Sequence, residues 1–230
     1  MRNTFCLILF LMNSIVTLYA ENVNDSLLRV LDKVISERQL YTEKKQTIIK
    51  ELKLKKSKLH TLDELYQLNA EIISQYETFI CDSAEYYIHE NIRIAEENDD
   101  KAHWLESKLH LAFVYSLSGL FVQANDIFKS IRCDSLPGYL QALYCWNRIR
   151  YYENLINYTD DVRFSNEYMR QKEAYRDTVM MILYDQSEEY LKERAVKLQE
   201  QGKNEEALGI LTEIYNEQVP ETHGYAMMAM

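Results

Sequence analysis

The sequence has little glycine and proline: 5 glycines and 2 prolines in 230 residues, where average usage would make these two types about 12% of a chain. β-Sandwiches and barrels need both residues at their many tight turns, and nucleotide-binding α/β folds need a glycine-rich phosphate loop. Hydrophobic residues make up 47% of the chain, which excludes a disordered protein. The composition therefore predicts an all-α protein whose helices are joined by short connections.

Basic residues are also in the minority, with 26 Lys and Arg against 36 Asp and Glu and a formal charge of −10. A negative surface repels phosphate backbones, so we expect no direct nucleic acid binding by this chain. The sequence shows no nucleophile motif such as Gly-x-Ser-x-Gly and no metal-type cysteine spacing. We therefore expect no enzyme, with no catalytic residue, no cofactor and no metal.

Two histidines and a glutamate form a candidate metal site. His103, Glu106 and His110 fall at i, i+3 and i+7, which places them on one helix face, and zinc uses such side chains. The alternative is an ordinary polar helix face, since no second cluster supplies a fourth ligand. We favour the polar face.

The N-terminus resembles a secretory signal. Residues 1–20 combine Arg2, a nearly continuous apolar run over 5–18 and a small residue, Ala20, at the expected cleavage position. The apolar run is short for a membrane span. We expect an exported, periplasmic protein, and an uncleaved N-terminal membrane anchor is the alternative.

Few cysteines remain after such a signal. Cys81, Cys133 and Cys145 are an odd number, so they do not make a complete disulfide framework. Cys133 and Cys145 can pair only if the turn at 136–138 brings them together. Buried free thiols on helices are the simpler interpretation.

A long amphipathic helix is predicted over residues 21–62. Apolar residues recur there every seven positions, as at Val34, Tyr41 and Ile48, without glycine or proline. The basic run at 53–58 is typical of a solvated helix face, and contact with anionic lipid or a partner is the alternative. Thr61, with Glu64 three residues later, predicts the cap of a new helix.

Two segments of the remaining chain match at a fixed offset. Gly119 and Gly202 are 83 residues apart, and further related pairs share that spacing. The matched positions, with Tyr115 beside them, define the repeat: Ala112, Tyr115, Gly119, Ala124, Phe128, Pro137, Ala195, Gly202, Ala207, Leu211 and Pro220.

Each unit reads as a helical hairpin. A small residue such as Ala112 permits close approach of another helix, and Gly119 permits the left-handed turn that ends the first helix. The second helix carries Ala124 and Phe128 inward, and Pro137 is expected to stop it. A hairpin cannot bury its own apolar face, so stacked hairpins, a solenoid, are predicted.

This order of small, aromatic, Gly, Ala, aromatic and Pro resembles the tetratricopeptide repeat. The resemblance is strongest over 103–137 and good over 188–220, although Lys108 stands where the motif has Trp. It implies a right-handed α-solenoid over 63–230, with about four repeats and the start of another, preceded by the long N-terminal helix.

Further stretches resemble one group of such proteins. The secretory N-terminus, the Lys-rich helix, Gly119-Leu-Phe-Val-Gln-Ala124, the Tyr-rich stretch 144–158 and the terminal His-Gly-Tyr-Ala-Met are similar to the periplasmic repeat region of membrane-anchored TPR transcriptional regulators of Gram-negative gut bacteria. In that family a membrane helix, a coiled coil and a cytoplasmic DNA-binding region follow the repeats. The chain stops one helix into a further unit, so we expect a fragment lacking its C-terminal part.

The resemblance also implies a function and candidate residues. It implies a non-catalytic scaffold that binds a peptide or protein partner and serves as a sensory region; a stand-alone periplasmic adaptor or assembly factor is the alternative. Membrane association would come through a missing C-terminal segment or an uncleaved N-terminus. The first helix of each tetratricopeptide unit lines the concave side, which makes the partner-binding candidates Glu106, Leu109, Phe113, Ser116, Glu189, Lys192, Val196 and Gln199.

Overall fold

The computed structural model describes residues 28–217, apart from 30, 60 and 186. The expected signal (1–20), Pro220 and the apolar chain end lie outside the described residues. The chain divides between Leu59 and His60 into two compact units, each described here by itself. Within the described residues, no helix is both long and apolar enough to cross a membrane.

The first unit is helical but not continuous. Helix over residues 31–36 ends in a turn at Glu37, α2 runs over Arg38–Lys55, and the short 3-10 helix η1 covers Lys56–Lys58. The prediction of one helix through 62 therefore differs from the structure. Leu59 and Thr61 have extended backbone, which Thr61 needs in order to cap the next helix, so the first helix cannot continue past them.

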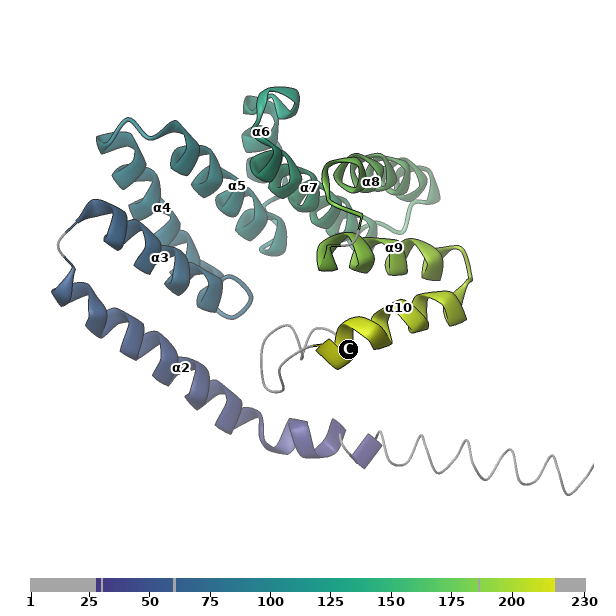
Figure 1. Ribbon diagram of the computed structural model, residues 1–230, viewed down its shortest axis with the longest axis horizontal. Helices are drawn as coiled ribbons and strands as arrows, with labels where there is room; N and C mark the ends of the chain where they lie inside the picture. Colours follow the sequence, from purple (N-terminus) through teal and green to yellow (C-terminus); the bar gives the residue numbers. More distant parts are fainter. Residues whose placement is uncertain (1–27, 30, 60, 186, 218–230) are drawn as a thin grey trace, which may run out of the picture. The chain divides into compact units, whose positions relative to one another are not determined.

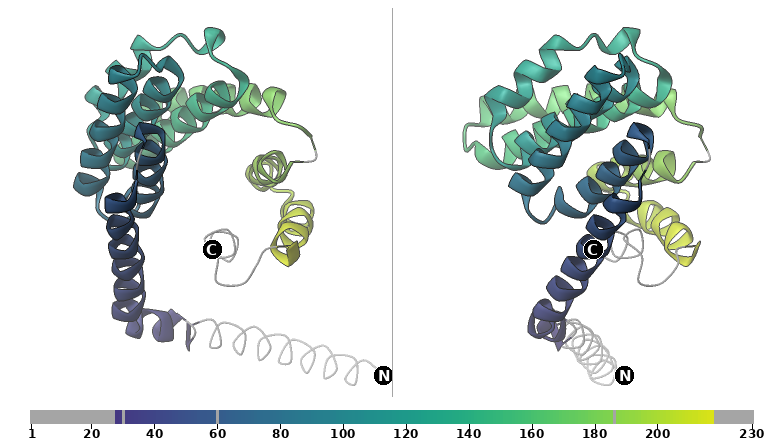
Figure 2. Two further views of the ribbon diagram at one scale, coloured as in Figure 1. Left: turned by 60° about the vertical axis from the view of Figure 1, so that its left-hand side comes forward. Right: turned by 90° about the vertical axis from the view of Figure 1, so that its left-hand side faces the viewer.

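The second unit is a succession of antiparallel helix pairs (Figures 1 and 2). The packed neighbours are α3 with α4, α5 with α6, α7 with α8 and α9 with α10. Their bounds are α3 Leu62–Tyr76, α4 Cys81–Glu97, α5 Lys101–Leu117, α6 Phe121–Ser130, α7 Gly138–Tyr158, α8 Val162–Ile182, α9 Glu188–Glu200 and α10 Asn204–Glu217. The predicted all-α helical-repeat fold is confirmed.

Local signals set several helix ends as expected. The Thr61 side chain accepts from the Glu64 backbone N–H while the Glu64 carboxylate accepts from the Thr61 backbone N–H, a complete capping box. Gly119 and Gly202 both have φ of +76° after α5 and α9. That left-handed conformation strains other residues, which explains why glycine occupies both positions.

The prediction that Pro137 stops a helix is wrong. α6 ends at Ser130, where Ile131 turns to an extended conformation. A 3-10 helix, η2 (Cys133–Ser135), follows, and Pro137 is the N-cap of α7. Proline restricts the residue before it to extended backbone, and Leu136 has that conformation. Pro137 therefore starts the next repeat.

Small residues allow the helices of each hairpin to approach closely. Ala84, Ala112, Ala124 and Ala195 are completely buried, and Ala207 is nearly so. One turn after Ala84 and Ala124, Ile88 and Phe128 fill the same position in successive repeats and are also buried. Leu211, the last residue of this pattern, is partly exposed.

Asparagine side chains connect successive repeats. Asn147 of α7 donates to the backbone carbonyl of Leu109 at 2.8 Å, and Asn154 donates to that of Ser116 at 3.2 Å. The two bonds join residues seven apart on α7 to residues seven apart on α5. They fix the stacking of the third hairpin on the second, since a polar bond specifies one register where apolar packing tolerates several.

Candidate partner-binding groove

A cavity of about 290 Å³ lies among helices α5, α7, α8 and α9. Helices α5, α7 and α9 are the first helices of three successive hairpins, the side that the resemblance assigned to a partner. The lining residues are Phe113, Trp146, Asn147, Ile149, Arg150, Glu153, Arg176, Glu193 and Val196. We refer to this cavity as the groove.

Two of the predicted binding residues meet in the groove. Phe113 comes from α5 and Val196 from α9, and they are 83 residues apart, the repeat offset. Equivalent positions of two hairpins therefore line the same cavity, with α7 contributing residues from the hairpin between them. These two positions are accessible, since Phe113 is half-buried and Val196 is exposed.

Leu109 and Ser116 are corrections to the predicted set. Leu109 is completely buried in the core, and Ser116 is buried with its hydroxyl donating to the Ala112 carbonyl at 2.7 Å. Both lie on the face of α5 that meets α7, because Asn147 and Asn154 bond to their backbone carbonyls. A partner cannot reach them in this fold.

The other predicted residues lie outside the groove lining. Glu106 accepts a hydrogen bond at 3.0 Å from the Tyr66 hydroxyl of α3. Lys192 pairs with Glu188 one turn earlier. Glu189 and Gln199 are exposed on α9.

The residues that α7 contributes were absent from the predicted set. Trp146, Arg150 and Glu153 fall at i, i+4 and i+7 and so occupy one face of α7. That spacing was visible in the sequence. The spacing alone does not assign these residues to a binding face, because no glycine or proline between 139 and 187 shows where the repeat begins and ends.

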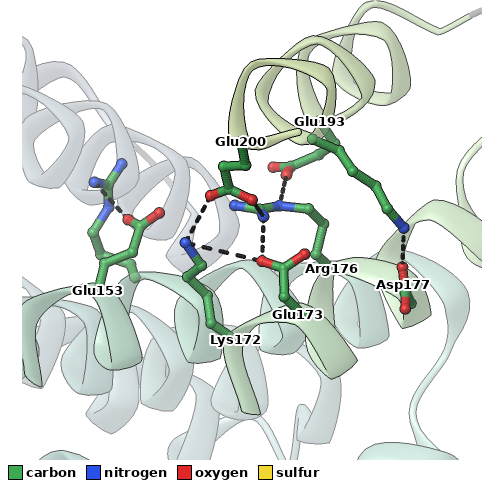
Figure 3. Close-up of polar contacts among 9 residues, drawn as sticks. Glu153, Lys172, Glu173, Arg176, Asp177, Glu193 and Glu200 are labelled. Atoms are coloured by element: carbon green, nitrogen blue, oxygen red, sulfur yellow. Dashed lines mark hydrogen bonds and ion pairs between the residues drawn. The ribbon is translucent and has the colours of Figure 1, made fainter. Parts of the chain in front are cut away.

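Two charged residues, Arg176 of α8 and Glu193 of α9, line one side of the groove and belong to an ionic cluster that extends beyond it. The Arg176 guanidinium, only 1% exposed, lies 3.1 Å from Glu193 and 2.6 Å from Glu200, and it also pairs with Glu173 (Figure 3). Lys172 adds an ion pair with Glu200 at 2.8 Å. Because these carboxylates come from α8 and α9, the ionic cluster joins the last hairpin to the one before it.

The ionic cluster shifts the pKa values of Arg176 and Glu200. Burial by itself lowers the pKa of Arg176, but the negative charges of Glu173, Glu200 and Glu193 outweigh it and raise that pKa. For Glu200, partial burial raises the pKa, and the hydrogen bond from Lys172 and the charge of Arg176 outweigh it, so the net pKa is lowered. Arg176 and Glu200 are therefore both charged at neutral pH.

The opposite side of the groove is aromatic and aliphatic, with Phe113, Trp146 and Ile149. Arg150 and Glu153 pair at 3.0 Å at its edge, and half of the Arg150 side chain is exposed. The groove thus offers an apolar surface beside a guanidinium and a carboxylate. Such a surface suits binding of a side chain with flanking backbone groups.

Each of the three residues of the candidate metal site interacts with a side chain outside that set. His103 Nδ1 lies 2.8 Å from Asp100, Glu106 contacts Tyr66, and His110 lies 3.5 Å from Glu77. Across the described residues, no group of three His, Cys, Asp or Glu side chains is arranged to hold a metal ion.

Burial raises the pKa of the Tyr66 phenol well above its usual range, which keeps this hydroxyl a hydrogen-bond donor.

Three tyrosines of the Tyr-rich stretch 144–158, namely Tyr144, Tyr151 and Tyr152, pack in the core. The rings of Tyr151, Tyr152, Phe128 and the partly buried Tyr175 surround the guanidinium of Arg148, which lies 4.8–5.4 Å from their centroids. Arg148 also donates to the Tyr152 hydroxyl at 2.5 Å. Tyr86, Tyr139 and Tyr158 are exposed, and none of these tyrosines lines the groove.

The comparisons with known proteins identify the fold family. The family model of the SusR N-terminal TPR domain matches residues 35–230. No curated protein and no solved structure gives a significant match. Repeats of this type generally serve as protein-interaction scaffolds. The chain therefore belongs to the SusR N-terminal TPR domain family.

Proposed function

We propose that this chain is the exported sensory region of a membrane-anchored transcriptional regulator and that it binds a peptide or protein partner in the groove. One observation carries the binding proposal: Phe113 and Val196, equivalent residues of two hairpins, line one cavity with Trp146 of the hairpin between them. A surface built from three successive hairpins accommodates an extended ligand and depends on how the hairpins are stacked.

The chemistry of the groove supports a polypeptide partner. Phe113, Trp146 and Ile149 provide the apolar area that dominates binding energy in protein interfaces, and Trp is enriched among residues that cost most on truncation. Arg150 and Glu153 at the edge provide a donor and an acceptor for a backbone amide. The groove therefore combines an apolar surface that holds a side chain of the partner with polar groups that orient its backbone.

Site-specific photo-crosslinking tests the groove. A photoreactive amino acid replaces Phe113 in one variant and Phe164 in another; Phe164 is an exposed aromatic residue of α8 outside the groove lining. We expect a discrete crosslinked protein from position 113 in the native cell, its loss on Trp146→Ala, and no such product from position 164. Equal crosslinking from both positions would refute a groove partner.

The export proposal is tested separately. Alkaline phosphatase fused after Glu217 folds to an active enzyme only outside the reducing cytoplasm, so an active fusion supports export. An inactive phosphatase fusion together with an active cytoplasmic reporter fusion at the same site would contradict it.

The coding sequence beyond Met230 distinguishes the regulator from the alternative. A membrane helix followed by a DNA-binding region would support the sensory role. A stop codon at that point would instead favour a stand-alone periplasmic adaptor or assembly factor.

A further inference from the structure

The structure brings together two cysteines that lie twelve positions apart. Cys133 opens the short helix η2, and Cys145 lies two turns inside α7. Both are free thiols, as is Cys81 of α4. Cys133 and Cys145 lie at the junction between the second hairpin, α5 with α6, and the third hairpin, α7 with α8.

The connection from η2 to α7 reverses the chain. The Leu136 backbone N–H donates to the Cys133 carbonyl at 3.0 Å, and Pro137 then starts α7, where its carbonyl accepts from Gln141 at 2.9 Å. η2 therefore packs on the first turns of α7. Cys133 packs against the core cluster that contains Cys145. Beside the larger effect of burial, each of the two thiols affects the pKa of the other, so they are neighbours in that cluster.

The two thiols have different access to solvent. Cys145 is completely buried in the core that contains Phe128 and Leu140, and Cys133 packs against that core while remaining partly exposed. Cys81 lies on another helix, with its thiol 3.7 Å from the Glu77 carbonyl. The arrangement gives one thiol that a reagent can reach and a second, buried thiol in the core cluster against which the first one packs.

We propose that Cys133 and Cys145 form an intrachain disulfide when the protein meets an oxidising thiol–disulfide environment. The oxidant is a disulfide, either of a dithiol oxidase or of a small thiol such as glutathione. Its formation in the cell rests on the export proposed above, whereas its formation in the purified protein does not.

The reaction balances in two exchange steps. The thiolate of Cys133 attacks the external disulfide, which forms a mixed disulfide and releases one external thiol. The thiolate of Cys145 then attacks the Cys133 sulfur and releases the second external thiol. Two protein thiols are oxidised and one external disulfide is reduced to two thiols.

The environment makes the exchange slow but does not prevent it. Burial raises the pKa of Cys133, and burial together with the neighbouring Cys133 sulfur raises that of Cys145 to about 12. Few thiolates are therefore present at neutral pH, and the rate rises with pH. The second step is intramolecular, so Cys145 does not have to reach the mixed disulfide by diffusion. This offsets the low fraction of Cys145 thiolate.

The bond would tie the connection after α6 to α7. A closed loop of this size removes conformational freedom from the unfolded chain and stabilises the fold, with an expected rise of the melting temperature by roughly 5–10 °C. The stacking of the second hairpin on the third, on which the groove depends, would be reinforced.

Oxidation of the purified full chain tests the proposal. The native protein is incubated with oxidised glutathione at pH 8.5, free thiols are alkylated, and peptide mapping reads positions 81, 133 and 145. We expect a 133–145 crosslinked peptide with a mass loss of about 2 Da, on the exchange stoichiometry above, while Cys81 stays alkylated. The Cys81→Ser variant should behave in the same way.

Two variants keep the test decisive. Cys133→Ser changes the partly exposed cysteine, so this variant should fold. It should form no crosslink, and its melting temperature should not rise on oxidation. Cys145→Ala should likewise show neither the crosslink nor the rise in melting temperature. Alkylation of both thiols after oxidation, or glutathione retained on Cys133, would overturn the proposal. A crosslink in the purified protein with free thiols in rapidly alkylated cells would uphold the pairing and count against export.

Discussion

The side-chain amide of Asn147 on α7 donates to the backbone carbonyl of Leu109 on α5 at 2.8 Å, and both residues are buried. This bond lies beside the groove, because Asn147 lines it and Phe113 is one turn after Leu109. It therefore connects the position of the third hairpin to the shape of the proposed binding surface.

Asn147→Ala should destabilise the protein by about 1–3 kcal/mol, because it removes a buried hydrogen bond and leaves a small cavity. Asn157→Ala, an exposed position on the same helix, is the matched control and should change stability by less than about 0.5 kcal/mol. Urea unfolding followed by circular dichroism measures both. Equal effects at the two positions would show that the buried bond adds nothing.

Gly119, Gly202 and Gly209 make an internal comparison. Gly119→Ala and Gly202→Ala should each cost about 1–2 kcal/mol, since both glycines have φ of +76°. The two costs should be similar, because the Cβ at 119 would make only a van der Waals contact of 3.4 Å with the end of the exposed Tyr158 side chain and the Cβ at 202 meets nothing within 4 Å.

Gly209→Ala is the control of opposite sign. Gly209 lies inside α10 with open space around it, so alanine should stabilise the helix by about 0.5–1 kcal/mol. Melting temperatures of the three variants give the order directly. A loss of stability at 209, or a gain at 202, would contradict the backbone assignment.

The ionic cluster predicts a pH dependence with a definite sign. The folded pKa of Glu200 is lowered below its ordinary value of 4.5, so its contribution to stability is present above pH 4.5 and is lost as the pH falls through the folded pKa. Glu200→Gln should therefore narrow the difference in unfolding free energy between pH 7 and pH 3.

Glu213→Gln, an exposed carboxylate of α10 away from its first turn, is the control and should leave that difference close to wild type. Urea unfolding at the two pH values, at low and at high salt, makes the measurement. If Glu200→Gln retains the full wild-type pH dependence, Glu200 does not contribute through its charge.

Arg148 tests whether the aromatic rings need a planar cation. Its guanidinium contacts four rings and its Nε has no hydrogen-bond partner. Arg148→Lys keeps the charge but loses the planar stacking, so it should cost about 1–3 kcal/mol. Arg150→Lys, half exposed on the same helix, should cost far less. Arg148→Met should be tolerated better than Arg148→Lys, because it removes the buried charge and keeps the volume.

Several features followed from the sequence because their causes are local. The scarcity of glycine and proline predicted helices, Thr61 and Glu64 predicted a capping box, and the matching positions of Gly119 and Gly202 predicted two left-handed turns. The same offset made Phe113 and Val196 equivalent. Each of these signals depends on residues within one helical turn or on a repeat of that pattern.

Other features were decided only by the tertiary structure. Periodicity identifies the apolar face of α5, but the crossing with α7 determines that Leu109 and Ser116 are buried while Phe113 borders the groove. A buried arginine such as Arg176 is stable only beside carboxylates that α9 supplies. The placement of Cys133 beside the core cluster of Cys145 likewise depends on how η2 packs against α7. Helix faces are set by local sequence, whereas the residues that meet across helices are set by stacking.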